Sequence, residues 1–544
     1  MTIQTATTMR SGIIGPKRTA PQAASLPSEA EITAFLADPS SYPERPERVD
    51  LIETHAARIF LAGEDVLKIK KHVRLPYLDF TTLSAREATL TRELELNRPA
   101  APDIYLGIKR ITRESSGGGL AFDGAGETVE FALHMRRFAQ EDVLGQAAVD
   151  GRIGRPLAKA MADVVFTAHE AAPVARDGDG IARFEKIIAD VAETCAASRD
   201  AQIRSQRATF ANEARVHLDR VRPLLAERAR AGFRRRCHGD LHLGNMVLWY
   251  GQPLPFDALE FDEDLATIDV LYDLAFLIMD LEHRELRPRA NDILNRYLWR
   301  ADVRNLEGLA ALPLFLALRA GIRTMVDLHR IAGADAPMPD VLTDAQRYLG
   351  QALQYLAPAR PALIAVGGLS GSGKSTLAAA LAPAFGVAPG AIHLRSDLER
   401  KKLFQIGETE RLPDEAYART VTQTVYATLN QKAASVIAAG YAVIVDAVHS
   451  APEERATVER VAQELALPFL GLWLDAPGAV LKDRVTMRKG DASDATADVI
   501  TQQLTYDLGD ITWHRLDASQ PFEKTCANAE TLIEALGHAG AKET

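Results

Sequence analysis

The sequence predicts two folds in one chain, an α+β domain followed by an α/β domain with a parallel sheet. At 544 residues the chain is longer than one hydrophobic core usually supports. A short strand pair near residue 60 is followed by long stretches of helical periodicity. Further along, strand and helix signals alternate, as they do in parallel α/β sheets. We therefore expect one domain at 28–355 and a second at 360–540.

The composition is that of a globular protein that acts on small molecules. Hydrophobic residues make up 47% and charged residues 25%, both close to the average for globular domains. The formal net charge is −10, from 63 basic and 73 acidic residues, and no block of lysine and arginine dominates a domain. The charge distribution therefore does not indicate a nucleic-acid partner, and small-molecule substrates are expected instead. The sequence gives no indication of the oligomeric state.

Three features indicate a cytoplasmic protein without a membrane partner. The three cysteines, Cys195, Cys237 and Cys526, lack the CxxC spacing of a zinc site or a disulfide framework. The longest uncharged run, 375–394, is interrupted by Pro and Gly, which favours a helix and loop over a membrane span. Residues 1–27 lack the apolar core of a signal peptide and are rich in Thr, Ser, Ala and Pro, so we expect a disordered tail.

The first ordered elements are expected near residue 28. Ser28 and Glu31 have the spacing of a helix capping box ahead of apolar residues at helical intervals. Residues 58–71 predict two short strands around a Gly-Glu-Asp turn, and 82–97 predict a helix. Two later stretches have apolar residues every three or four positions and should be mainly helical, 155–232 and 264–356.

Between these helical stretches lies the motif HGDLHLGN, residues 238–245. Asp240 and Asn245 are five residues apart, and kinase catalytic loops use an Asp and an Asn at this spacing for two roles. Asp240 is our candidate for accepting the proton of an acceptor hydroxyl, and Asn245 for holding a metal ion. Asp257, twelve residues later in LPFDALEF, is the candidate metal carboxylate on the next strand.

A lysine is needed opposite the phosphates of such a site. Lys68, in the strand VLKIK, is our choice, and Lys70 remains open because residues two apart on a strand face the same side. Glu93 on the following helix is expected to orient the lysine, with Glu87 as its competitor. The first hairpin contains no clear GxGxxG, so the other phosphate contacts of this half stay undefined.

A second, unrelated phosphate-binding motif begins at residue 368. GLSGSGKS matches GxxxxGK[ST] and lies between the apolar strand ALIAVG and the helical stretch STLAAALA. In such a loop, glycines turn backbone N–H groups toward phosphate oxygens, the lysine reaches the terminal phosphates, and the next hydroxyl binds Mg²⁺. The residues expected to bind ATP or its Mg²⁺ here are Gly368, Ser370, Gly371, Ser372, Gly373, Lys374, Ser375 and Thr376.

Two aspartates follow strands of the same domain. Asp446 ends the strand YAVIVDA, at the sheet edge where ligands collect, and is our candidate Mg²⁺ carboxylate. Asp397, just beyond the strand AIHLRS, is the candidate acceptor of a hydroxyl proton. A structural role is open for both, since Asp446 could be a polar strand end and Ser396 with Glu399 could form a capping box around Asp397.

Arg484 and Arg488 supply positive charge later in this domain. They are four residues apart in LKDRVTMRKG and should share one helix face. Such a face could close over the transferring phosphates as a cationic lid. The alternative is a solvated helix end.

The segment 28–355 resembles the aminoglycoside phosphotransferase and choline kinase group through HGDLHLGN and the parts around it. Gly239 stands where the loop of protein kinases has Arg, and the resemblance therefore implies a small-molecule acceptor. By the same resemblance, Asp273 in YDLAFL would brace the catalytic loop rather than react.

The C-terminal half resembles the small P-loop kinases of the gluconate kinase, chloramphenicol phosphotransferase and zeta-toxin type. Their order of phosphate loop, acceptor aspartate and arginine lid is repeated by Lys374, Asp397 and Arg484 with Arg488. No ABC-type LSGGQ signature follows, which favours phosphoryl transfer over a mechanical ATPase. The whole chain resembles bacterial two-domain proteins that join both kinds of domain.

These motifs predict an ATP-dependent kinase with two separate ATP and Mg²⁺ sites, each transferring the γ-phosphoryl group to a hydroxyl of a small molecule. One alternative is a nucleotide-sensing protein in which one site only binds ATP. A further alternative is aminoglycoside resistance, because the seven acids within 257–273 would attract a cationic substrate. We favour the simpler interpretation, in which some of these acids bind metal, some cap helices and the rest face water.

Overall fold

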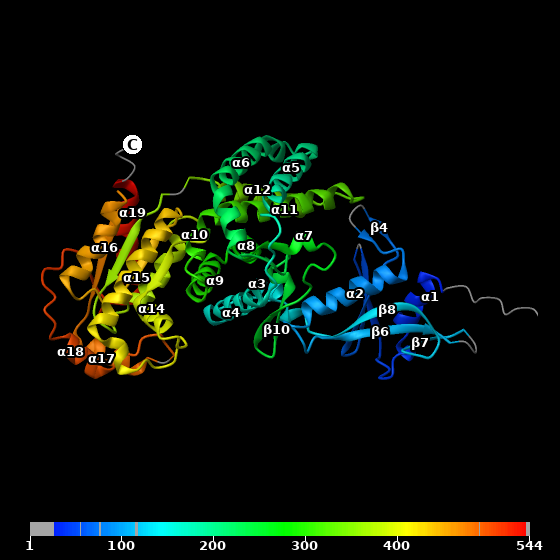
Figure 1. The fold of residues 1–544 in the computed structure, drawn as a ribbon, viewed down its shortest axis with the longest axis horizontal. Helices are drawn as coiled ribbons and strands as arrows, with labels where there is room; N and C mark the ends of the chain where they lie inside the picture. The colour runs from blue at the N-terminus through cyan, green and yellow to red at the C-terminus, as the bar shows by residue number, and fades with distance from the viewer. Residues whose placement is uncertain are drawn as a thin grey trace, which may run out of the picture. The chain divides into compact units, whose positions relative to one another are not determined.

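Almost all of the expected tail lies outside the residues that the computed structural model describes, which are 27–54, 56–75, 78–114, 118–358, 360–488 and 490–539. The chain divides into two compact units. The first comprises the residues up to Arg98 with Pro102–Arg137, drawn in blue to cyan in Figure 1. The second comprises Pro99–Ala101 and everything from Phe138 onward, so it includes both the HGDLHLGN and the GLSGSGKS motifs.

The first unit is built on one antiparallel sheet. Its strands lie in the order β1-β2-β3-β8-β6-β7, with the bounds Val49–Glu53, Ala57–Ala62, Asp65–Lys70, Glu127–Arg136, Tyr105–Arg113 and Leu120–Phe122. The expected hairpin is confirmed as β2 and β3, which turn at Gly63, where φ is +62°. A short antiparallel pair, β4 (Arg74–Leu75) with β5 (Leu78–Asp79), follows.

Two helices accompany this sheet, α1 (Glu29–Ala37) and α2 (Leu83–Asn97), and both confirm the sequence prediction. α1 begins where expected because Ser28 Oγ accepts the N–H of Glu31 at 3.2 Å. The capping box is half formed, since the Glu31 carboxylate pairs with Arg113 at 2.7 Å instead of returning to the helix start.

The second unit begins with a mainly helical part around the HGDLHLGN motif, as predicted. Its strands form two antiparallel pairs, β9 (Arg234–Arg236) with β12 (Thr267–Asp269) and β10 (Met246–Trp249) with β11 (Gln252–Pro255). Its helices are α3 (Leu144–Val149), α4 (Arg155–Ala171), α5 (Ile181–Ala197), α6 (Ala201–Arg230), α7 (Glu263–Ala266), α8 (Val270–His283), α9 (Arg287–Arg300), α10 (Asn305–Gly308), α11 (Leu312–Ala332) and α12 (Pro339–Tyr355).

Helix α8 runs through the core of this helical part. Every residue from Val270 to Leu281 is buried, including Asp273 and Asp280, so its two acids must find partners inside the fold. The described chain also has one stretch, Asn305–Ala332, that is long and apolar enough to cross a membrane by length and composition. In its most apolar window, 67% is buried inside the fold, as in a core helix.

The last part of the chain is the predicted parallel α/β fold. Five parallel strands lie in the order β14-β15-β13-β16-β17, with the bounds Ile392–Arg395, Val443–Asp446, Leu363–Gly367, Phe469–Asp475 and His514–Asp517. α15 (Arg419–Ala438) and α16 (Pro452–Glu464) pack on one face, and α13 (Lys374–Leu381) and α19 (Phe522–Ala539) on the other. Figure 1 shows these elements in yellow-green to red, with three shorter helices, α14 (Ser396–Leu403), α17 (Gly478–Met487) and α18 (Ala497–Gln503).

Candidate active sites

A glycine fixes the shape of the loop His238–Asn245. Gly239 has a φ of +85°, and a Cβ atom there would lie 2.9 Å from the Cβ of Ala266 and 3.1 Å from the Cβ of Leu259. Glycine satisfies both the left-handed backbone and this close approach, whereas a larger residue would not. The glycine that distinguishes this loop from that of protein kinases therefore has a steric reason of its own.

Asp240 and Asn245 interact directly within this loop. The Asn245 Nδ2 donates to Asp240 Oδ2 at 2.9 Å and to the Asp240 carbonyl at 3.0 Å. Burial would raise the pKa of Asp240, but His242, whose Nε2 lies 3.6 Å from Oδ2, and nearby positive charge lower it to about 2. The half-buried carboxylate is therefore ionised at neutral pH and can accept a hydrogen bond from an acceptor hydroxyl.

Asp273 braces the loop from α8, as the sequence suggested. Its carboxylate accepts the N–H groups of His238 at 3.2 Å and Gly239 at 2.9 Å. Two turns further along the same helix, Asp280 accepts the N–H of Leu243 at 3.0 Å. Both buried acids thus satisfy backbone donors of the loop, and α8 fixes the loop at two points.

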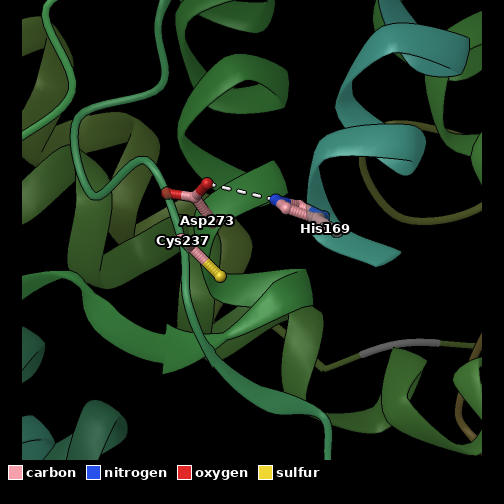
Figure 2. A group of neighbouring side chains, drawn as sticks. All are labelled: His169, Cys237 and Asp273. Atoms are coloured by element: carbon pink, nitrogen blue, oxygen red, sulfur yellow. Dashed lines mark hydrogen bonds and ion pairs between the residues drawn. The ribbon is translucent and has the colours of Figure 1, made fainter. Parts of the chain in front are cut away.

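Figure 2 shows Asp273 beside His169 and Cys237, three buried side chains whose ligand-type atoms lie within 4.8 Å of one another. Both ring nitrogens of His169 are already used, one with Asp273 at 3.1 Å and the other with the Tyr297 hydroxyl at 2.9 Å. Burial raises the pKa of the Cys237 thiol well above its ordinary value, and the thiol contacts the carbonyl of Ile268 at 3.6 Å. The cluster is therefore an internal hydrogen-bond network behind the loop rather than a metal centre.

The hairpin of β10 and β11 returns the chain to Asn245. The Phe256 N–H donates to the Asn245 carbonyl at 3.0 Å, so Asp257 follows directly beside this residue. Asp257 lies two residues beyond the end of β11 instead of on a strand as expected, because its φ of +58° breaks the extended backbone. Asp257 and Asn245, twelve residues apart in sequence, are thus brought near each other by the backbone of this hairpin.

In the first unit, both candidate lysines bind the same carboxylate. Lys68 Nζ lies 2.7 Å from Glu93 Oε1, and Lys70 Nζ lies 2.8 Å from Glu93 Oε2. The competitor Glu87 is exposed, so Glu93 is the partner. Burial alone would raise the pKa of Glu93, but the two lysines lower it to about 2, so its carboxylate is ionised at neutral pH.

Three of the seven acids within 257–273 make structural contacts inside the fold. Asp262 and Asp269 accept N–H groups at the starts of α7 and α8. Asp269 also binds the buried Arg228 at 2.7 Å, and Asp273 braces the loop His238–Asn245. These contacts favour structural roles for the acids over a wall that attracts a cationic substrate.

The loop between β13 and α13 has the backbone of a phosphate cradle. Gly368, Gly371 and Gly373 have φ values of +136°, +80° and +94°. A Cβ atom at Gly368 would lie 2.6 Å from the Leu474 carbonyl oxygen, and one at Gly371 would lie 2.7 Å from the Leu481 carbonyl oxygen. The motif's first and fourth positions therefore need glycine for close backbone approach as well as for conformation.

Two serines of this loop have different surroundings. Ser370 is held by Gln503 of α18, whose Oε1 accepts the Ser370 N–H at 2.8 Å and whose Nε2 donates to its Oγ at 3.1 Å. Ser372 Oγ is buried and has no hydrogen-bond partner in the described part of the chain. A buried hydroxyl inside a glycine cradle is suited to donate to a phosphate oxygen.

Lys374 opens α13 and turns back over the loop, where its Nζ donates to the Leu369 carbonyl at 3.1 Å. Burial lowers the pKa of Lys374, and the charges of Asp446 and Asp397 partly offset this effect. The lysine and both aspartates therefore lie close enough to interact. Two hydroxyls predicted to bind the nucleotide follow in the first turn of the same helix, half-buried Ser375 and exposed Thr376.

Asp446 is buried at the end of β15 and is held by two basic residues of β14. His393 Nε2 lies 3.2 Å from Asp446 Oδ2, and Arg395 Nε lies 3.7 Å from the same oxygen. Burial would raise the pKa of Asp446, but the hydrogen bond from His393, with Arg395 and Lys374, lowers it to about 2. An ionised carboxylate beside the phosphate loop is a suitable Mg²⁺ ligand.

Asp397 lies in the first turn of α14, where burial raises its pKa despite the nearby Arg395. A carboxylate with a raised pKa is suited to accept a hydroxyl proton. The capping box suggested for this turn does not form, because the helix begins at Ser396 itself and Glu399 binds Lys432 at 2.6 Å instead.

Arg484 and Arg488 do not share a helix face, contrary to expectation, because α17 ends before Arg488, whose backbone is extended. Arg484 donates to the Ala518 carbonyl at 2.7 Å. Arg488 binds Asp491 at 3.4 Å, and Asp491 also binds Arg395 at 3.1 Å. The structure thus brings Arg488, but not Arg484, into the charge network around Asp446 and Lys374.

Sequence reasoning missed several members of this site. His393 and Arg395 had one usable signal, since they are polar residues alternating on an otherwise apolar strand directly before Asp397. Gln503 and Asp491 had none, because the contacts that bring them to the site, with Ser370 and Arg395, span 133 and 96 positions of the chain.

Comparisons with known proteins found relatives of the whole chain and of its parts. Residues 363–506 match the family model described as an AAA domain, which spans β13 to α18. Uncharacterised proteins of Mycobacterium tuberculosis (strain H37Rv) and Mycobacterium bovis are each 29% identical over 493 residues, covering 88% of this chain and 94% of theirs.

Similar solved structures match one part of the chain or the other. A gluconokinase from Sinorhizobium meliloti has a TM-score of 0.26 and 22% identity, covering 34% of this chain and 98% of its own. A choline/ethanolamine kinase family protein from Mesorhizobium loti has a TM-score of 0.35 and 13% identity, with coverage of 59% and 99%. A choline kinase from Cryptosporidium parvum has a TM-score of 0.36 and 10% identity, with coverage of 60% and 94%.

Proposed function

We propose that the protein is an ATP-dependent phosphotransferase with two separate sites, one around Asp240 and one around Lys374. Each site would bind ATP with Mg²⁺ and transfer the γ-phosphoryl group to a hydroxyl group of a small molecule. The observation that carries the proposal is that Lys374, Asp397 and Asp446 lie at or just beyond the C-terminal ends of the neighbouring parallel strands β13, β14 and β15. Phosphoryl transfer needs a phosphate clamp, a metal carboxylate and a proton acceptor, and these residue types supply all three.

At the second site, the glycine cradle with the buried Ser372 hydroxyl fits the phosphates of ATP. Ser375 and Asp446 would hold Mg²⁺, which neutralises charge on the phosphates when bound. Lys374 would leave the Leu369 carbonyl to bind the terminal phosphates. Asp397, with its raised pKa, would accept the proton of the attacking hydroxyl.

At the first site, Asp240 would orient the acceptor hydroxyl, and its low pKa suits it to hydrogen bonding more than to proton storage. Asn245 and Asp257 offer amide and carboxylate oxygens of the kind that Mg²⁺ prefers. In the first unit, Lys68 or Lys70, held by Glu93, offers a positive charge of the kind that neutralises phosphates.

ATP turnover of the purified full chain tests this proposal. Wild type, Asp240→Ala and Lys374→Ala are compared with and without a pooled library of amino sugars, sugar acids, nucleosides and amino alcohols. Exposed residues provide matched controls, Asp219→Ala and Lys186→Ala. We expect the library to stimulate turnover and each site variant to remove a different part of the response.

A different result would favour the sensing alternative. If the library has no effect and Lys374→Ala alone lowers a slow basal rate, the site around Asp240 binds nucleotide without transferring phosphate. If only the amino sugars of the library stimulate turnover and Asp240→Ala abolishes this effect, the aminoglycoside alternative is supported instead. If neither variant changes turnover, the proposed function is wrong.

A further inference from the structure

Helix α9, which belongs to the helical part, binds the edge of the parallel sheet through two asparagines. Asn295 Oδ1 accepts the N–H of His393 at 2.7 Å. The amide Nδ2 groups of Asn291 and Asn295 donate to the Ala391 carbonyl at 3.1 and 3.3 Å. Because β14 stands at one end of the strand order, its outward backbone groups lack a neighbouring strand, and these side chains replace one.

The same helix also holds the segment that follows β14. Trp299 Nε1 donates to the carbonyl of Leu398, the residue after Asp397, at 3.0 Å. In return, Lys402 Nζ donates to the carbonyls of Trp299 at 2.6 Å and Ala301 at 2.7 Å. The strand and the helix start that present Asp397 are therefore both anchored outside the parallel α/β fold.

One of these anchored residues reaches directly into the candidate site. His393 is fixed at its backbone N–H by Asn295 and binds Asp446 Oδ2 through its ring at 3.2 Å. On the same strand, Arg395 lies 3.7 Å from that oxygen. A shift of β14 would therefore move both basic groups that hold the Asp446 carboxylate.

Close packing is incomplete on this side of β14. A cavity of about 60 Å³ lies between α4, α9 and β14 and is lined by His393 and Arg395. Other charged residues that line the cavity form salt bridges with one another, as Lys159 does with Glu408 at 2.8 Å. Directional hydrogen bonds from α9 therefore hold this side of β14 together with the packing of buried Ile392 and Leu394.

We propose that Asn295 is a positioning residue of the Lys374 site, so that the helical part of the chain completes the site of the parallel α/β part. Asn295 acts through His393 on the orientation of Asp446. The inference rests on the proposed function of the Lys374 site.

The test uses the full chain carrying Asp240→Asn, which silences the other site. In this background, ATP turnover with the acceptor library is compared for Asn295→Leu, Asn295→Asp and the parent. Asn212→Leu, the same change at an exposed position on α6, is the matched control. Nucleotide affinity is measured by titration with a fluorescent ATP analogue, once with Mg²⁺ and once with EDTA.

We expect Asn295→Leu to lower kcat about 10- to 100-fold, while ATP affinity in EDTA stays within about twofold. Asn295→Asp keeps an oxygen that can accept the His393 N–H, so this variant should retain most of the parent's kcat. Asn212→Leu should behave as the parent. Hydrogen exchange at the His393 amide should speed up in the Leu variant and stay slow in the Asp variant.

A kcat in Asn295→Leu equal to that of the Asp240→Asn parent would overturn the inference, and so would an equal loss in the Leu and Asp variants. If the parent itself shows no turnover that depends on Lys374, the proposed function fails instead. In that case, the increase in ATP affinity between EDTA and Mg²⁺ tests the inference without any need for turnover. Loss of that gain in Asn295→Leu and its retention in Asn295→Asp would support it, and an equal gain in both would overturn it.

Discussion

Asn245 donates its side-chain amide to the carboxylate of Asp240 at 2.9 Å, so the candidate metal ligand also orients the candidate proton acceptor. Asp240→Asn keeps the size of the side chain but removes the charge that an acceptor hydroxyl would meet. In a Lys374→Ala background, we expect acceptor-stimulated kcat to fall about 10²- to 10⁴-fold. Steady-state ATP turnover checks this, with exposed Asp219→Asn as the control. Unchanged kcat would remove Asp240 from the reaction.

Asp273 is predicted to matter for stability more than for chemistry. Its buried carboxylate accepts two backbone N–H groups of the loop and lies beside His169 and Arg319. Asp273→Ala leaves these partners unsatisfied in the core, so we expect the free energy of unfolding to fall by about 3–5 kcal/mol. Urea denaturation followed by circular dichroism measures this change. Asp219→Ala, on the surface of α6, should change stability by less than about 0.5 kcal/mol.

Local patterns were sufficient to predict much of the fold. The hairpin around Gly63 and the order of strands and helices after residue 360 follow from hydrophobic periodicity, which is a property of neighbouring residues. The contacts of Asp240 with Asn245 also arise within one short loop, whose spacing is visible in the sequence. These elements needed no knowledge of distant parts of the chain.

Long-range packing decides the rest of the candidate sites. Asn295 meets His393 across 98 positions, and no periodicity links the two. The end of α17 before Arg488 depends on contacts of the following loop, so an i, i+4 rule predicted the wrong geometry. The choice of Glu93 over Glu87 likewise depends on which face of α2 is buried.

His449 is predicted to make the parallel α/β part sensitive to acid. Its ring is buried, and neither ring nitrogen has a hydrogen-bond partner among the described residues. Burial lowers the pKa of His449 from 6.5 to about 3. The unfolded chain therefore binds a proton that the folded chain refuses between these pH values, and the free energy of unfolding falls as the pH falls through this window.

His449→Phe should remove this decrease in the free energy of unfolding at low pH. We expect wild type to lose about 2–3 kcal/mol more than the variant between pH 7 and 4.5. Urea denaturation at a series of pH values checks this. His514→Phe, at an exposed histidine of β17, should leave the pH dependence unchanged. Parallel curves for wild type and His449→Phe would show that the ring is not kept neutral by burial.

Ala variants of Gly371 and Gly440 would distinguish the effect of steric contact from the effect of backbone strain. Both have a left-handed φ, +80° and +88°, but a Cβ atom at Gly371 would meet the Leu481 carbonyl oxygen at 2.7 Å, whereas one at Gly440 meets nothing within 4 Å. Each Ala variant should cost about 1–2 kcal/mol for the backbone. Only Gly371→Ala should also distort the phosphate loop and weaken binding of a fluorescent ATP analogue about tenfold or more. Equal affinities in the two variants would contradict this.

The shared salt bridge of Lys68 and Lys70 with Glu93 leads to different predictions for the two lysines. Lys70 is 3% exposed and lies 5.9 Å from the ring of Phe80, whereas Lys68 is 13% exposed. The more accessible amine is the one that can turn toward a phosphate. In a Lys374→Ala background, we therefore expect Lys68→Met to lower kcat about 100-fold with little change in stability.

Lys70→Met should instead lower the free energy of unfolding by about 3 kcal/mol, because it removes one of the two lysines that pair with the buried Glu93 carboxylate. Part of its turnover should survive at temperatures where the variant is folded. Lys71→Met is the matched control, since this neighbour binds Glu53 at the surface of the sheet. The assignment of the two lysines would be reversed if Lys70→Met abolished turnover at full stability while Lys68→Met lost stability and kept its rate.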